Sequence, residues 1–508
     1  MTAPHPDALC LDGASLTAAQ VTSLARAPRP VHLDPQARAR VTAARAAAIE
    51  AASRRPVYGH STGVGANRTT TLDEEGTRAF GLRLLRSHAG GIGPLVPVEQ
   101  SRAMLAVRLN QLLGAGSAID GAVVDALAQA LTDGHVPEVH ALGSLGTADL
   151  TALAELGLTL VGEQPWHPGA GLGAPPRPLA LTSWDALPLL SSSALTIGQA
   201  ALAATDLRTL LDRLPLVAAL SLTAVRGSLE PYAEAVHARR PHPGGQDVAA
   251  RMRLLLPRPD WRPALVQDPF GFRCLPQVHG AAMDAWAALD RVLAVELNAS
   301  AENPLFDGSD YYHHGGFHQA PLALAADQMR LALLGTAQLT TARQGALNEP
   351  GFTGLPAFLA EADNGSSGVM ITEVAAHSAL AELRGAAQPV TLGHTVISRG
   401  VEEHASFAAT AARRLAEAVD HFRLVLACEL VAAVRALRMQ GRTAPGEGEL
   451  AQFHQAAAAV LTPDLADHKL TGDVHTAAAL LKSPDLDLDL AIAAPAMASG
   501  FDELDELV

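Results

Sequence analysis

The stretch 406–439 limits what this chain can fold into more than any other feature. It contains neither proline nor glycine, so nothing in it breaks a helix. A helix of more than thirty residues exceeds the usual length in globular proteins. We therefore expect it to cross a large helical bundle or a subunit interface. Its apolar residues recur every three or four positions and form one stripe: Leu415, Val419, Phe422, Leu426, Leu430 and Val434.

The composition also favours an all-α fold. Alanine and leucine dominate, aromatic residues make up only 4%, and runs of β-branched residues are scarce. The hydrophobic fraction of 48% supplies a large core, whereas charged residues, at 18%, are few for the surface of a monomer. We therefore expect a large, elongated helical bundle with part of its surface buried between subunits.

Charge and cysteine content exclude several kinds of partner and site. The net charge of −15 disfavours nucleic acid, whose phosphates require basic surface. Cys10, Cys274 and Cys428 are odd in number and far apart, so neither disulfides nor a zinc site is expected. Residues 1–13 lack the pattern of a signal peptide, and charges within 206–213 interrupt the longest apolar run. These features predict a cytoplasmic protein with a small-molecule ligand and no membrane contact.

Proline and glycine divide the chain. Residues 163–188 hold six prolines and several glycines, which is typical of an exposed connection. We therefore predict an N-terminal helical portion with loops over 1–188 and a central long-helix bundle over 189–445. A C-terminal helical region over 446–508 ends in an acidic tail, which is expected to be peripheral.

A turn at residues 143–149 precedes a second helical pattern. Gly143 and Gly146 permit a tight backbone, and Asp149 stands at a helix N-cap position. Leucines at helical spacing follow: Leu150, Leu153, Leu156 and Leu160.

Seven further blocks accompany this turn in a consistent order. They lie at 58–65, 87–93, 226–244, 266–280, 303–305, 315–318 and 401–406. With them, the chain resembles the aromatic amino acid ammonia-lyase and aminomutase family, and histidine ammonia-lyases in particular. The resemblance implies a largely α-helical homotetramer whose active sites combine loops from three subunits.

The turn departs from the family pattern where the family builds its electrophile. In the family, an Ala-Ser-Gly triad cyclises to methylideneimidazolone (MIO). Here only Thr147 and Ala148 stand between Gly146 and Asp149, so one residue and the serine are missing. We therefore expect no MIO and no other cofactor. Further family residues are replaced by Ile197, Phe270, Gly316 and Val401.

Several polar site positions are retained. The resemblance places Tyr58 as the catalytic base, with Glu402 as its acid–base partner. A tyrosine has a pKa of about 10, so it acts as a base only where cations or donors stabilise its phenolate. The guanidinium of Arg273 suits a substrate carboxylate, which it can bind with two hydrogen bonds. Other positions that the resemblance assigns to substrate binding are His88, Gln267, Phe270, Phe317 and Ile197.

Structural roles are open for the same residues. Glu402 and its neighbours could cap the long helix, because acidic side chains are favourable at a helix start. Arg273 could belong to a buried ion pair, and His88 could be a hydrogen-bonded structural histidine. Three histidines lie within 313–318, but two stand in a glycine-rich loop without a carboxylate at ligand spacing. No metal site is therefore expected.

The missing triad shapes the functional hypothesis. General acid–base catalysis alone typically accelerates a reaction about 10²–10⁴-fold. That rate enhancement is too small for the removal of an unactivated β-proton. Our main prediction is therefore an MIO-independent enzyme, lyase-like or cyclase/isomerase-like, in secondary metabolism. It would perform elimination, conjugate addition, cyclisation or isomerisation on an activated metabolite. The alternatives are a non-catalytic scaffold or regulatory paralogue, and an ammonia-lyase or aminomutase with an atypical electrophile made from Thr147.

Overall fold

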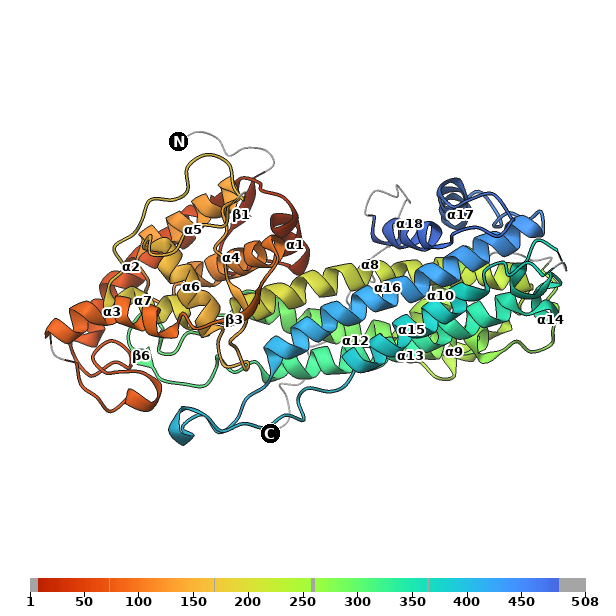
Figure 1. Ribbon diagram of the computed structural model, residues 1–508. Helices are drawn as coiled ribbons and strands as arrows, with labels where there is room; N and C mark the ends of the chain where they lie inside the picture. The colour runs from red at the N-terminus through yellow and green to blue at the C-terminus, as the bar shows by residue number, and fades with distance from the viewer. Residues whose placement is uncertain (1–7, 73, 169, 257–260, 363–364, 484–508) are drawn as a thin grey trace, which may run out of the picture.

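The computed structural model describes residues 8–72, 74–168, 170–256, 261–362 and 365–483. It is an elongated, mostly helical molecule, so the expected all-α bundle is confirmed (Figure 1). Long helices run along its length: α8 (Ala194–Val225), α12 (Leu275–Glu296), α13 (Ala320–Asn348), α15 (Met370–Ala386) and α16 (Ala408–Met439). Shorter helices flank this bundle: α9 (Glu234–Ala238), α10 (Pro243–Leu255), α11 (Phe270–Arg273) and α14 (Pro350–Thr353).

Helix α16 is the long helix that the sequence predicts. Its 32 residues span about 48 Å, and all six residues of the predicted stripe are buried. It begins at Ala408, two residues later than predicted. Phe407 has a φ of 57°, and its N–H donates to the carbonyl of Leu145 at 2.8 Å. The helix therefore starts where the chain contacts the turn at 143–149.

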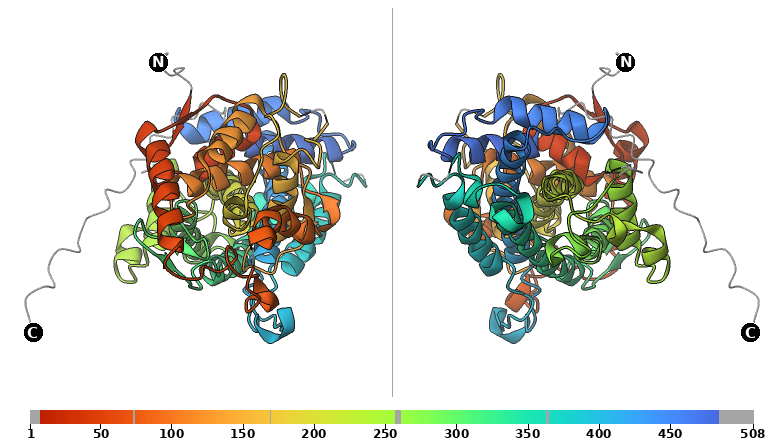
Figure 2. Two further views of the ribbon diagram at one scale, coloured as in Figure 1. Left: turned by 90° about the vertical axis from the view of Figure 1, so that its left-hand side faces the viewer. Right: turned by 90° about the vertical axis from the view of Figure 1, so that its right-hand side faces the viewer.

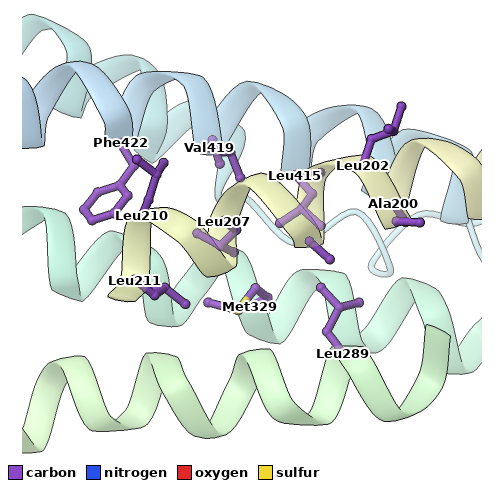
Figure 3. Packing of buried hydrophobic residues seen from close by; sticks show 14 of the residues in the cluster. Ala200, Leu202, Leu207, Leu210, Leu211, Leu289, Met329, Leu415, Val419 and Phe422 are labelled. Atoms are coloured by element: carbon purple, nitrogen blue, oxygen red, sulfur yellow. The ribbon is translucent and has the colours of Figure 1, made fainter. Parts of the chain in front are cut away.

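The core of the bundle lies between α8, α16 and α13. Figure 3 shows Leu207 and Leu210 of α8 close to Leu415 and Phe422 of α16, with Met329 of α13 on the other side of α8. Each of these side chains is almost completely buried, and burial of one such side chain contributes about 1.5–3 kcal/mol.

Helix α8 also explains the longest apolar run. Residues Ser183–Val225, which include α7 (Ser183–Leu190) and α8, could cross a membrane by length and composition. However, 94% of the most apolar window is buried inside the protein. The apolar side chains of α8 pack against the other helices of the bundle, as in the core helix of a globular protein.

The N-terminal part packs around one end of the bundle (Figure 1). Its helices are α1 (Ala18–Arg26), α2 (Pro35–Ala52), α3 (Glu74–His88), α4 (Val98–Leu113), α5 (Gly121–Asp133), α6 (Leu150–Leu160) and α7. Short strands pair two by two: β1 (Leu9–Leu11) with β2 (Val31–Leu33), parallel, and β3 (Ile92–Leu95) with β4 (His140–Leu142), antiparallel. Between α12 and α13, β5 (Leu305–Phe306) pairs with β6 (Tyr311–Tyr312), also antiparallel.

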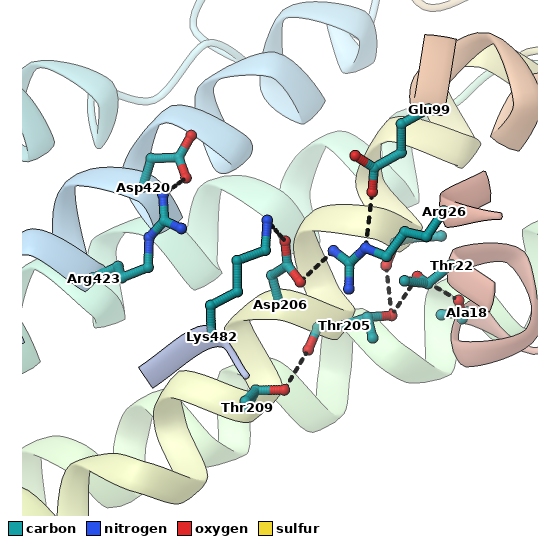
Figure 4. Close-up of polar contacts among 11 residues, drawn as sticks. Ala18, Thr22, Arg26, Glu99, Thr205, Asp206, Thr209, Asp420, Arg423 and Lys482 are labelled. Atoms are coloured by element: carbon teal, nitrogen blue, oxygen red, sulfur yellow. Dashed lines mark hydrogen bonds and ion pairs between the residues drawn. The ribbon is translucent and has the colours of Figure 1, made fainter. Parts of the chain in front are cut away.

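Polar contacts join this part to the bundle (Figure 4). Arg26 of α1 forms ion pairs with Glu99 of α4 and with Asp206 of α8, and Lys482 approaches Asp206 at 3.8 Å. The Arg26 side chain is partly exposed, so each of its pairs contributes less than about 1 kcal/mol.

The C-terminal helices α17 (Glu449–Val460) and α18 (Thr471–Lys482) contact α8 and α16. The acidic tail lies outside the described residues. One hydrophobic cluster extends from Leu11 to Leu481. The predicted three-part division stays a prediction.

Candidate active site

The turn at 143–149 has the tight backbone that its glycines predict. Gly146 has a φ of +90°, a conformation that L side chains rarely adopt. A Cβ added there would lie 2.1 Å from the hydroxyl oxygen of Ser406 and 2.8 Å from the nitrogen of Ala408. The Ser144 hydroxyl accepts from the Gly146 N–H and donates to the Ala148 carbonyl. Hydrogen bonds within the turn therefore stabilise it, and its backbone packs directly against the start of α16.

The carbonyl of Gly146 accepts two hydrogen bonds from segments that are distant in sequence. It accepts the backbone N–H of Gln319 at 3.1 Å and the hydroxyl of Ser406 at 2.9 Å. Both donors stand just before a helix, Gln319 before α13 and Ser406 before α16. Sequence reasoning did not assign either residue, because neither a serine nor a glutamine at a helix start reveals which distant carbonyl it will meet.

Four helices begin around the turn. Besides α13 and α16, α6 follows it directly, and α8 starts next to Asp149. Asp149 stands at the predicted N-cap of α6, but its carboxylate does not cap that helix. It accepts instead the backbone N–H and the hydroxyl of Thr196 in the first turn of α8. The positive ends of four helix dipoles thus surround Gly146, an arrangement that favours negative charge.

Tyr58 lies in the loop that follows α2. Its half-buried hydroxyl accepts the N–H of Gly65 at 2.6 Å. Burial raises the pKa of Tyr58, and the charge of Glu402 adds to this, whereas the Gly65 hydrogen bond and Arg68 act in the opposite direction. The hydroxyl is therefore largely protonated at neutral pH within a single chain.

Glu402 lies on a second loop, which contacts the loop that carries Tyr58. The backbone of Glu402 pairs with Ile397 around the short helix η4 (Ser398–Gly400), which contacts η1 (Gly65–Asn67). Figure 2 shows these two loops, in orange and in cyan, projecting together from the body. The predicted pair Tyr58 and Glu402 is therefore brought together by two segments that are distant in sequence.

Three other predicted positions have different surroundings. His88 is the last residue of α3. Its Nδ1 lies 3.0 Å from the Leu84 carbonyl, so the side chain forms a hydrogen bond within the last turn of its own helix. Phe317 is half-buried and stands two residues before Gln319. Ile197 is 1% exposed in the first turn of α8, where it belongs to the hydrophobic core. His318 and His404, which were not assigned, lie 3.1 Å apart between Nε2 and Nδ1.

The remaining predicted positions lie elsewhere in the chain. Gln267, Phe270 and Arg273 are on or next to α11, and the Gly271 carbonyl of that helix accepts a hydrogen bond from Arg343 Nη1. Arg343 is more than six turns along α13 from Gln319, a distance of about 35 Å. Because Gln319 contacts Gly146, Arg273 lies far from the turn at 143–149 within one chain.

Two contacts hold the side chain of Arg273 beside α11. The Nε of Arg273 donates to the Asp268 carbonyl at 2.8 Å, and its guanidinium lies 4.7 Å from the ring centre of Phe270. Phe270 and Gln267 are exposed, whereas Arg273 is half-buried. This places a fixed guanidinium on an exposed surface.

Comparison with known proteins agrees with this architecture. The model of the family described as aromatic amino acid lyase matches residues 16–459. Histidine ammonia-lyase of Myxococcus xanthus is 32% identical, over 94% of this chain and 97% of the relative. That of Sorangium cellulosum is 34% identical, over 93% of this chain and 96% of the relative.

Solved structures are similar as well. Histidine ammonia-lyase of Trypanosoma cruzi has a TM-score of 0.86 at 26% identity and covers 94% of both chains. Ergothionase, an ergothioneine-degrading enzyme of Treponema denticola, has a TM-score of 0.85 at 27% identity and covers 94% of this chain and 99% of its own.

These relatives overturn the main functional prediction. Near full-length matches to histidine ammonia-lyases favour ordinary amino acid deamination over cyclase or isomerase chemistry on an activated metabolite. The prediction gave too much weight to the shortened turn and too little to the rest of the chain. Full-length sequence similarity and a shared fold establish that the chain belongs to the aromatic amino acid lyase family.

Proposed function

We propose that the protein is an amino acid ammonia-lyase that removes ammonia from histidine or a similar aromatic amino acid. The histidine ammonia-lyases among its relatives support this substrate class. The observation that carries the proposal is the Gly146 carbonyl, which accepts two hydrogen bonds where four helices begin. Such a site suits the formation of an electrophile from the peptide itself and the stabilisation of negative charge.

The residues of the turn fit a peptide-derived electrophile other than MIO. Ring closure would join the Ala148 nitrogen to the carbonyl carbon of Gly146, and that oxygen would leave as water. Thr147 would lose its Cα hydrogen and its hydroxyl as a second water. Because threonine carries a methyl group on Cβ, the product would bear one methyl more than MIO. We therefore keep the expectation that MIO itself is absent.

The surroundings of the turn support this chemistry. The two donors on the Gly146 carbonyl polarise the carbon that the Ala148 nitrogen would attack, and they stabilise the developing charge on its oxygen. Gly146 itself has no room for a side chain. When formed, the group would withdraw electrons from the bound amino acid and thereby make its β-proton removable.

Tyr58 would take the proton in this reaction. Its hydroxyl already accepts the Gly65 N–H, a contact that also stabilises the phenolate. Glu402, on the neighbouring loop, would exchange protons with the substrate amine.

Arg273 would hold the substrate carboxylate with two hydrogen bonds. Since α11 lies about 35 Å from the turn along α13, we propose that a second copy of the chain supplies Arg273. The homotetramer implied by the family resemblance would provide that copy, and the low content of charged residues supports buried subunit surfaces.

Intact-protein mass tests the electrophile, and ammonia release tests the reaction. We expect the purified protein to lack two water molecules and to release ammonia from histidine or another aromatic amino acid. Thr147→Ala should restore the full mass and abolish release. Thr147→Ser should keep the deficit, since serine can dehydrate in the same way. A wild-type protein with unmodified mass that releases no ammonia from any aromatic amino acid would refute the proposal.

A further inference from the structure

Two histidines stand beside the two donors of the Gly146 carbonyl. His318 directly precedes Gln319 in the sequence. His404 stands two residues before Ser406. The Nε2 of His318 and the Nδ1 of His404 are 3.1 Å apart, which is hydrogen-bond distance. The two side chains therefore join the segments that each supply one donor.

The hydrogen bond between the rings requires one donor and one acceptor. A neutral imidazole carries one of each, whereas a protonated imidazole carries two donors. Burial and the charge of His404 lower the pKa of His318, so the His318 ring is neutral at pH 7. A neutral His318 accepts from a protonated His404 and can bond to a neutral His404 in either direction. The bond can therefore form at neutral pH whatever the charge of His404.

The helices that follow the two histidines are held together without them. Four fully buried alanines form one cluster between α13 and α16: Ala323, Ala326, Ala408 and Ala411. Arg330 of α13 also donates to the Ala411 carbonyl of α16 at 2.8 Å. Loss of the histidine contact should therefore leave the packing of these helices intact.

The residues ahead of the helices have fewer direct links. His404 is exposed, and His318 is half-buried. Among the described residues, no other hydrogen bond joins the segment 315–319 directly to the segment 402–406. The histidines thus connect the two segments near the surface, and the buried Gly146 carbonyl connects them inside the protein.

We propose that His318 and His404 are a positioning pair, which holds both donors on the Gly146 carbonyl. Their hydrogen bond fixes the spacing of the two segments, so that the Gln319 N–H and the Ser406 hydroxyl reach one oxygen at the same time. Two donors stabilise negative charge on that oxygen more than one does. The consequence for ring closure at the turn rests on the proposed function, whereas the placement of the donors does not.

Amide hydrogen exchange, read at single residues by mass spectrometry, tests the placement. The reporters are the N–H of Gln319, bound to the Gly146 carbonyl, and the N–H of Phe407, bound to the Leu145 carbonyl. His404→Leu removes the histidine contact at an exposed position, so the variant is expected to fold. Both reporters should exchange about 2–10-fold faster in it, the factor that loss of one hydrogen bond implies.

His404→Asn is the conservative variant. Its side-chain amide places an oxygen or a nitrogen where Nδ1 of the histidine stands, so it can still bond to His318. Exchange at Gln319 should therefore match the wild type. His468→Leu is the matched control, since it removes a histidine hydrogen bond far from the turn. His468 lines a cavity with Arg435, about 40 Å along α16 from the start of that helix. This variant should leave exchange at Gln319 unchanged.

Two exchange results would overturn the inference. One is equal exchange at Gln319 in the wild type and in His404→Leu. The other is fast exchange that His404→Asn does not restore, because the hydrogen bond would then not be the cause.

Intact mass after a pulse of expression tests the consequence for the turn. The loss of two water molecules should proceed more slowly in His404→Leu than in the wild type, and His404→Asn should restore the wild-type rate. Equal rates in all three proteins would overturn this part of the inference. A wild type that shows no mass deficit and releases no ammonia would refute the proposed function instead, and the exchange results would still decide the role of the pair.

Discussion

The guanidinium of Arg343 and the carboxylate of Glu429 form two hydrogen bonds of 2.7 Å each, and neither side chain is exposed. Glu429 Oε1 also accepts the hydroxyl of Ser221, so α8, α13 and α16 meet at this pair. Arg343 in turn donates to the Gly271 carbonyl of α11. The pair thus ties the bundle core to the segment that presents Arg273.

Glu429→Gln is expected to destabilise the protein strongly. It leaves the buried Arg343 guanidinium without its counter-charge, and breaking such a pair costs about 3–5 kcal/mol. Chemical denaturation measures the free energy of unfolding. The control is Glu417→Gln, which removes an exposed partner of Arg414 and should cost less than about 1 kcal/mol. Equal losses in both variants would contradict the role of burial.

Tyr58→Phe should keep the fold and lose activity. Removal of a general base typically lowers kcat by about 10²–10⁴-fold. The variant keeps the aromatic ring of residue 58, which lines a small cavity together with Trp184 and Glu302. Its melting temperature should therefore stay close to that of the wild type. Steady-state kinetics with the best amino acid substrate give the ratio. An unchanged kcat would remove Tyr58 from the reaction.

The pH profile should follow the titration of Tyr58. Because burial raises the pKa of this hydroxyl, its basic form is scarce at pH 7 and increases with pH. We expect kcat/KM to rise about tenfold per pH unit from pH 7 toward the folded pKa. Arg68 lowers that pKa, so Arg68→Gln should shift the profile to higher pH. Arg423→Gln, on α16, is the control and should leave the profile in place; a flat wild-type profile would contradict the assignment.

Gly146→Ala should prevent maturation of the turn. The substitution places a methyl group 2.1 Å from Ser406 Oγ at a φ of +90°. The left-handed backbone alone costs about 1–2 kcal/mol, and the clash adds to it. Mass spectrometry should show the full, unmodified mass. Gly173→Ala is the control: its φ is also positive, but nothing lies within 4 Å of the added Cβ. A retained mass deficit in Gly146→Ala would show that the turn tolerates a side chain.

Mixed oligomers should reveal a shared site. Tyr58→Phe and Arg273→Ala are each expected to be inactive alone. Co-expressed in equal amounts, they should recover about a quarter of the wild-type activity, since some sites combine an intact Tyr58 with an intact Arg273 from another copy. Size-exclusion chromatography checks that the copies assemble. No recovery in assembled mixtures would place both residues in the same chain's site.

The sequence predicts the fold better than the site. The α16 helix follows from its unbroken apolar stripe, because that pattern depends only on local spacing. The pairs of short strands were not predicted, since segments of two to four residues such as β3 carry too little periodicity. The carboxylate of Asp149 binds α8 rather than α6, which depends on packing that local sequence does not encode.

The site residues divide in the same way. Tyr58 and Glu402 lie together as the family resemblance implies, although Glu402 follows Tyr58 by more than three hundred residues. Arg273 does not join them within one chain, because α11 contacts α13 near Arg343, about 35 Å along that helix from the turn at 143–149. Gln319 and Ser406 were missed, since their function depends on a single carbonyl far away in sequence.

The positions of these two donors in the sequence determine when, during synthesis, the Gly146 carbonyl can receive its hydrogen bonds. Residues 319 and 406 are synthesised long after Gly146, and neither can reach its carbonyl until α13 and α16 are in place. A nascent or truncated chain therefore carries an ordinary peptide at the turn. If the turn modifies itself as proposed, the loss of two water molecules is irreversible. A chain that shows this mass deficit has therefore folded its whole bundle at least once, even if it is unfolded when measured.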